Sequence, residues 1–86
     1  MPRISFFYGI AIYMYYRDHA PPHFHAIYRG DEAVVGIAAA QVLRGGLPHR
    51  AASLVTEWAT IHRDELVRNW ERATAGEPLL PVPPLE

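Results

Sequence analysis

A stretch rich in histidine and proline constrains the fold of this chain more than any other part of the sequence. Residues 18–25 read Asp-His-Ala-Pro-Pro-His-Phe-His and hold three of the five histidines. Proline has no backbone N–H and a fixed φ, so Pro21 and Pro22 cannot join a regular strand pairing. Apolar and aromatic residues precede the stretch and follow it. The stretch therefore predicts a turn that joins two strands and carries a cluster of titratable side chains.

Alternating β-branched and aromatic residues predict strands on both sides of this turn. The alternation runs from Ile4 to Arg17 and is interrupted at Gly9, which suits a bulge or a turn. Polar residues at 29–32 suit a hairpin turn. The expected strands cover residues 4–8, 10–17, 23–28, 32–37 and, weakly, 41–44. We expect an antiparallel sheet of three to four strands.

A helical period follows the sheet. Pro48 suits the first turn of a helix and Gly76 suits its C-terminal cap, so one helix of about 27 residues is expected between them. Its inward stripe is Ala51, Leu54, Val55, Trp58, Ile61, Leu66 and Ala73. Residues 77–86 hold four of the eight prolines, which predicts an extended tail. The predicted fold is α+β, a sheet packed against one long C-terminal helix in a single domain of residues 1–76.

The composition of the chain excludes several classes of function. The chain has 86 residues, a net charge of −1 and no cysteine. One small domain is expected, without disulfides or thiolate zinc sites. The near-neutral charge argues against broad, non-specific nucleic-acid binding. We see no secretion signal and no membrane span, so a cytoplasmic chain is expected. All eight basic residues are arginines, which suits phosphate contacts or reflects a GC-rich genome.

The histidine cluster is the first candidate site. His23 and His25 are two residues apart, so on a strand they point to the same face. The turn can fold His19 back toward them. Three imidazoles so placed would suit zinc or another transition metal, with Asp18 either a further ligand or an acceptor that fixes the tautomer of a histidine. The same residues also suit a metal-free functional site, or ordinary strand histidines that hydrogen-bond the turn backbone and Asp18.

His62 is the second candidate, because it lies near the middle of the apolar helical stripe with Asn69 on the same side. Polar groups on a core face need hydrogen-bond partners. His62 and Asn69 would then be a satisfied buried pair. Alternatively, His62 reaches the rim of the histidine cluster and serves as a fourth ligand or an acid–base partner.

Tyrosines form the third candidate. Tyr13 and Tyr15 share the strand parity of Arg17, and Tyr28 lies on the following strand. Aromatic residues beside an arginine on an open sheet face can stack RNA bases. They can equally be cross-strand pairs that stabilise the sheet.

Longer motifs show a resemblance to a known family. The run Ile4-Ser5-x-Phe7-Tyr8-Gly9-Ile10-x-Ile12-x-Met14-Tyr15-Tyr16-x-Asp18-His19-x-Pro21-Pro22-His23-Phe24-His25 resembles the opening of domain-of-unknown-function family 4160. Later motifs match as well: Leu47-Pro48-x-Arg50-Ala51, Glu57-Trp58-Ala59-x-x-His62-Arg63-x-Glu65-Leu66 and Asn69-Trp70. Members are small, mostly bacterial proteins. The resemblance implies a gene setting similar to a toxin–antitoxin pair, and it brings no catalytic residues with it.

Two functions are expected, and the sequence leaves open whether the protein is an enzyme. In the first, it is the toxin-like component of a bacterial two-gene module. It acts on RNA through His19, His23, His25 and His62, with Arg17 steadying the phosphate. A small antitoxin-like protein or a second copy of the chain would be its partner. In the second, it is a non-catalytic protein-interaction module whose histidines are structural or hold a metal.

Overall fold

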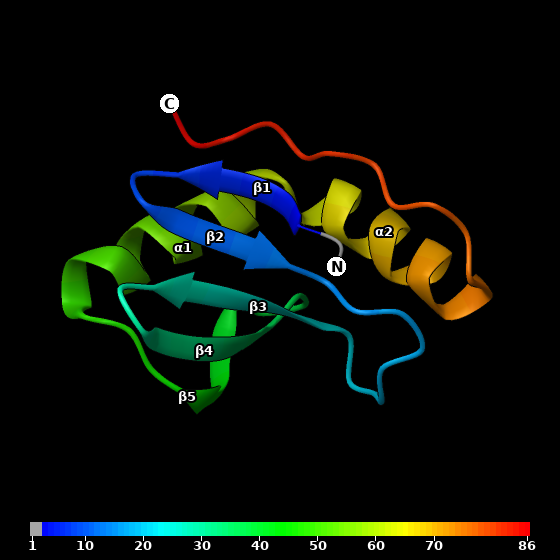
Figure 1. Ribbon diagram of the computed structural model, residues 1–86, viewed down its shortest axis with the longest axis horizontal. Helices are drawn as coiled ribbons and strands as arrows, with labels where there is room; N and C mark the ends of the chain where they lie inside the picture. Colours follow the sequence, from blue (N-terminus) through cyan, green and yellow to red (C-terminus); the bar gives the residue numbers. More distant parts are fainter. Residues whose placement is uncertain (1–2) are drawn as a thin grey trace.

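The computed structural model describes residues 3–86 and shows a meander of five antiparallel strands with two helices (Figure 1). The strands are β1 (Arg3–Phe7), β2 (Ile10–Tyr13), β3 (His23–Tyr28), β4 (Asp31–Gly36) and β5 (Gln41–Gly45), and they lie in this order in the sheet. The predicted α+β class is confirmed. The predicted count of three to four strands is wrong, because both β1 and β5 pair along the sheet as full strands. Met1 and Pro2, which begin the predicted domain, lie outside the described residues.

Two-residue turns join two of the hairpins. Tyr8-Gly9 connects β1 to β2, Arg29-Gly30 connects β3 to β4, and all four residues have positive φ. Positive φ at both central positions defines the type I′ turn, whose twist matches that of paired strands. β2 was expected to reach Arg17 but ends at Tyr13. Arg17 also has a positive φ, of 52°, which is incompatible with a strand.

One face of the sheet packs on α1 (His49–Ile61) and forms the core (Figure 1). The cross-strand register places Ile12, Phe24 and Val35 on this face. The ring centroid of Trp58 in α1 lies 5.2 Å from that of Phe7 and 5.6 Å from that of Phe24. Burying each such side chain contributes about 1.5–3 kcal/mol. The hydrophobic core therefore lies mainly between the sheet and α1.

The single long helix that we predicted is wrong, because α2 (Arg63–Ala75) is a separate helix. His62 has φ −106° and ψ 26°, and these angles turn the chain between α1 and α2. The sequence carries no signal for this corner, since hydrogen bonds from His62 N–H to Trp58 O and from Leu66 N–H to His62 O span it. Ile61, predicted to face inward, is 61% exposed at the corner. Neither helix in residues 3–86 is long and apolar enough to cross a membrane.

Residues 77–86 contain no helix or strand and run back along α2 and β1 (Figure 1). Trp58 Nε1–H donates to Pro83 O at 2.8 Å, and Val82 N–H donates to Ile4 O at 2.8 Å. The Val82 side chain is buried in the core cluster. The tail therefore completes the core and covers the outer edge of β1.

Candidate functional site

The loop of residues 14–22 between β2 and β3 carries Asp18. It extends beyond the sheet on the side of α2 (Figure 1). Arg17 N–H donates to Ala73 O of α2 at 3.2 Å, and Ile37 N–H donates to Pro22 O at 3.1 Å. The peptide bond between Ala20 and Pro21 is cis. These contacts hold the Asp18 carboxylate against the start of β3, on the face of the sheet opposite α1, which we call the open face.

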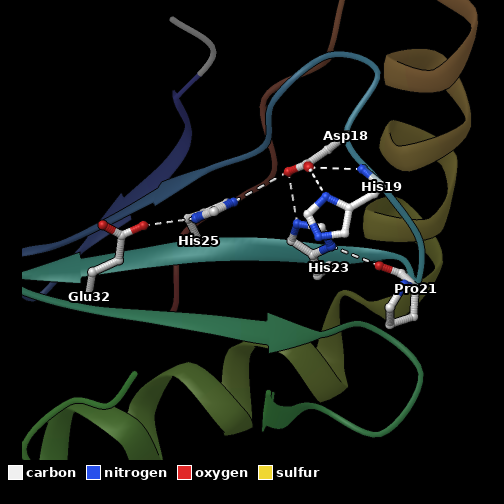
Figure 2. A network of polar contacts seen from close by, with 6 residues as sticks. All are labelled: Asp18, His19, Pro21, His23, His25 and Glu32. Carbon is white, nitrogen blue, oxygen red and sulfur yellow. Dashed lines mark hydrogen bonds and ion pairs between the residues drawn. The ribbon is translucent and has the colours of Figure 1, made fainter. Parts of the chain in front are cut away.

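His23 and His25 point toward Asp18 from the open face. Nε2 of His23 lies 2.9 Å from Asp18 Oδ2, and Nε2 of His25 lies 3.6 Å from the same oxygen (Figure 2). One potential ligand atom from each of the three residues lies within 4.8 Å of the others. The predicted histidine cluster is present in part: two imidazole nitrogens and a carboxylate oxygen converge on one point, and His19 is not among them. We refer to these three residues as the Asp18 cluster.

The second nitrogen of each ring is held by an acceptor outside the cluster (Figure 2). Nδ1 of His23 lies 2.7 Å from Pro21 O, and Nδ1 of His25 lies 2.9 Å from Glu32 Oε2. A carbonyl or carboxylate oxygen can only accept, so both Nδ1 atoms must carry the proton. Each Nε2 then either carries a second proton and donates to Asp18, or presents a lone pair that a cation shared with the Asp18 carboxylate would satisfy. The sequence analysis missed Glu32, which only the pairing of β3 with β4 brings to His25.

Both imidazoles are buried. His23 is 4% exposed and His25 is 9% exposed. The His25 ring meets Tyr15 edge-on at a centroid distance of 4.6 Å, and the His23 ring lies 5.1 Å from Trp70 of α2. Within residues 3–86, Nε2 of His25 is buried and has no hydrogen-bond partner. Leaving such an atom unpaired costs about 1–3 kcal/mol, so a further partner at this nitrogen would stabilise the cluster.

The pKa of Asp18 and the pKa of Tyr15 are both shifted by their surroundings in the cluster. Burial raises the pKa of Asp18, but the backbone N–H of His19 and the His23 ring outweigh this effect and leave the pKa below its ordinary value. Burial, together with the nearby carboxylate of Glu32, raises the pKa of Tyr15. Asp18 is therefore held in its anionic form, which is the form that binds a cation.

A hollow of about 180 Å³ opens beside the cluster, and we call it the entrance hollow. It is lined by His19, Pro21, His23, Val34, Leu43 and Arg44. The His19 side chain is 75% exposed, and its ring centroid lies 5.7 Å from that of His23. Arg44 has no carboxylate within ion-pair distance among the described residues. The sequence analysis missed Arg44. Its place at the site follows from the strand register, which sets it opposite Val34.

The structure does not bring Arg17 or His62 to the Asp18 cluster. A side-chain carbon built on Gly76 would lie 2.9 Å from a guanidinium nitrogen of Arg17, so Arg17 packs at the end of α2. The His62 ring bonds Glu65 and lies 5.8 Å from the Trp58 ring, tilted by 45°, at the corner between the helices. Asn69 is satisfied by Leu80, to which it donates at 2.8 Å and from which it accepts at 3.0 Å.

The predicted tyrosine group is divided between the two faces. The Tyr13 and Tyr15 rings both lie on the open face, nearly parallel at 3° with centroids 6.3 Å apart. Tyr28 has the parity of Phe24 and lies on the helix side, where it lines a hollow with Ile10 and other residues. Tyr13 and Tyr15 therefore lie beside the cluster and Tyr28 does not.

The fold and the site define a small α+β protein with a histidine–aspartate cluster on the open face of a five-stranded meander. The family described as Domain of unknown function (DUF4160) matches residues 9–71, and the chain belongs to this family. The match confirms the resemblance seen in the motifs. No curated protein and no solved structure matches the chain.

Proposed function

We propose that the Asp18 cluster binds one divalent transition-metal ion such as zinc, and that this centre is where the protein acts on RNA. The metal proposal rests on the orientation of the His23 and His25 rings. Both Nε2 atoms point at Asp18 Oδ2, while both Nδ1 atoms bond oxygens outside the cluster. Histidine ligands of metals are commonly oriented in this way by an outer carbonyl or carboxylate, which fixes the tautomer. A metal ion would also give Nε2 of His25 its missing partner.

Three protein ligands suit an open metal site. Catalytic zinc sites keep three protein ligands and leave a position for water or substrate. The entrance hollow gives access from solvent beside His23. A metal ion in such a position polarises a phosphoryl oxygen or lowers the pKa of water. These properties support hydrolysis of an RNA phosphodiester, with Arg44 of the entrance hollow in the phosphate-steadying role.

In this proposal the protein is the toxin-like component of a bacterial two-gene module. It acts in the cytoplasm, and an antitoxin-like partner protein restrains it. The support for this role is the family's gene setting, which the motifs imply, together with an accessible site of titratable groups.

A second candidate is metal-free acid–base cleavage of RNA by His19 and His23. It is favoured by the short separation of these two rings beside the entrance hollow. One imidazole removes the proton of a ribose 2′-OH, whose oxygen bonds to phosphorus. The other imidazole protonates the departing 5′ oxygen as the P–O bond breaks. The products are a 2′,3′-cyclic phosphate and a free 5′-OH.

Metal analysis of untagged protein tests the first proposal. We expect one equivalent of zinc or another transition metal after purification, and its loss in His25→Ala. His49→Ala is the matched control, because His49 is an exposed histidine at the start of α1. Added zinc should stabilise the wild type by about 2.7 kcal/mol at a hundredfold excess over Kd. Equal metal content in all three proteins, or none in any of them, would refute a metal at the Asp18 cluster.

RNA cleavage assays with and without a chelator separate the candidate chemistries. Loss of cleavage in the chelator supports the metal centre. Cleavage that persists in the chelator and leaves cyclic phosphate ends supports the acid–base candidate. A protein that binds metal but neither cleaves RNA nor arrests growth would be the non-catalytic interaction module, with a metal-holding cluster.

A further inference from the structure

The open face carries one row of residues across all five strands. The register pairs Arg3 with Tyr13, Tyr13 with His25, His25 with Val34, and Val34 with Arg44. Residues directly opposite each other in antiparallel strands point to the same face. The row therefore has an arginine at each end, an aromatic residue, and at its centre His25, a ligand of the proposed metal site. We call it the five-strand row.

We propose that single-stranded RNA binds along the five-strand row, with phosphates at Arg3 and Arg44 and bases stacked on Tyr13 and Tyr15. This inference rests on the proposed function and names the residues that would bring the substrate to the Asp18 cluster. The two end strands are four strand spacings apart, or about 19 Å. That length suits the lower end of single-strand binding sites, about four nucleotides.

The two arginines are available for phosphate. Arg3 and Arg44 are exposed, and neither has a carboxylate within ion-pair distance in the described part of the chain. The Arg3 guanidinium lies over the ring of Phe6 at 5.1 Å, on the same open face. Guanidinium groups contact phosphate through paired N–H donors. Both ends of the row can therefore hold the backbone of a strand.

The tyrosines offer a surface for bases. The Tyr13 and Tyr15 rings are parallel to within 3° and lie next to His25, which Tyr15 touches edge-on. Base stacking on aromatic rings is tolerant of sequence, because every base has a π face. Asp18 and Glu32 also lie on this face, and both are bonded to histidines. A metal ion at the Asp18 cluster would offset their negative charge.

The test is fluorescence anisotropy of a labelled octaribonucleotide with full-length, untagged protein. Chelator-treated and zinc-loaded protein are measured separately, and zinc uptake is measured on the same samples. We expect both forms of the protein to bind the RNA, the zinc-loaded form more tightly. We expect DNA of the same sequence to bind no more tightly than the RNA. No RNA binding in either form would overturn the inference, whereas the zinc measurement would still report on the proposed metal site.

Variants locate the bound strand. Arg44→Ala and Tyr13→Leu should each weaken binding about tenfold, and Tyr13→Phe should retain it. Arg68→Ala is the control, because it removes the same charge from an exposed position on α2. Equal weakening by Arg68→Ala would overturn the inference, since binding would then not follow the open face.

The salt dependence separates a phosphate contact from a structural effect. Arg44→Ala should reduce the slope of log affinity against log salt by about 0.7. Tyr13→Leu should leave the slope unchanged, because it removes stacking and no charge. An unchanged slope in Arg44→Ala would contradict a phosphate contact at this end of the row. Thermal unfolding of each variant shows that it is folded before the comparison is made.

Discussion

Neighbouring residues of β3 are buried on opposite faces of the sheet, and different interactions hold the two sides. Phe24 and Ala26 are fully buried against the α1 side, where Trp58 packs on Phe24. His23 and His25 are nearly as buried on the open face, where directed contacts to oxygens surround them. Apolar contacts are non-directional and tolerate small shifts, whereas the histidines need their partners in fixed positions. The comparison indicates that the α1 side supplies stability and the open face supplies the site.

The largest expected effect is on the α1 side. Trp58→Ala should cost about 3–5 kcal/mol in the free energy of unfolding, through lost burial and the cavity left behind. Urea denaturation measures this change. Val67→Ala, at an exposed position of α2, is the control and should change stability by no more than about 0.5 kcal/mol. A cost below about 1 kcal/mol for Trp58→Ala would refute the division between the two sides.

The next largest loss of stability is expected when an imidazole is placed on the α1 side of β3. Phe24→His should cost about 2–4 kcal/mol, because it removes a packed ring and buries polar atoms without partners. Phe24→Leu keeps the site apolar and should cost about 1.5 kcal/mol or less. Both are measured by chemical denaturation in chelator. Equal losses of unfolding free energy in the two variants would show that the α1 side does not discriminate against polar side chains.

An intermediate effect is expected at the edge that carries Arg44. Gly45 has a φ of +72°, and a side-chain carbon there would lie 2.2 Å from Glu32 O. Gly45→Ala should therefore cost about 1–3 kcal/mol through backbone strain and disturb the neighbouring arginine. Gly46→Ala meets no atom within 4 Å, so it should leave thermal unfolding nearly unchanged. If both variants melted alike, the close approach of β5 to β4 would not matter to the fold.

The smallest change in stability is expected at the cluster. His25→Phe in chelator should alter the free energy of unfolding by about 1 kcal/mol or less, because it removes the unpartnered Nε2. The hydrogen bond from Nδ1 to Glu32 is also lost, but the half-exposed Glu32 carboxylate can bond water instead. The same variant should lose all stabilisation by added zinc, which differential scanning calorimetry would record. A large loss of stability without metal would place His25 among the residues that hold the fold.

Much of this comparison could be predicted from the sequence. The two-residue spacing of His23 and His25 placed both on one face, and the Pro21-Pro22 pair placed the turn before them. Glu32 and Arg44 could not be found, because they reach the site only through pairing between strands. The corner at His62 was also hidden, since local periodicity changes little when hydrogen bonds persist across a single altered residue. Local patterns thus identified the candidate ligands, and pairing between distant strands brought up the groups around them.

The alternation along β3 also limits how this strand can change in length. Side chains of a strand repeat every two residues, so a shift by one residue sends each to the opposite face. A single-codon insertion between His23 and His25 would direct one imidazole beneath α1. Point substitutions can therefore alter the chemistry of this site gradually, whereas insertions or deletions within the strand would abolish it in one step.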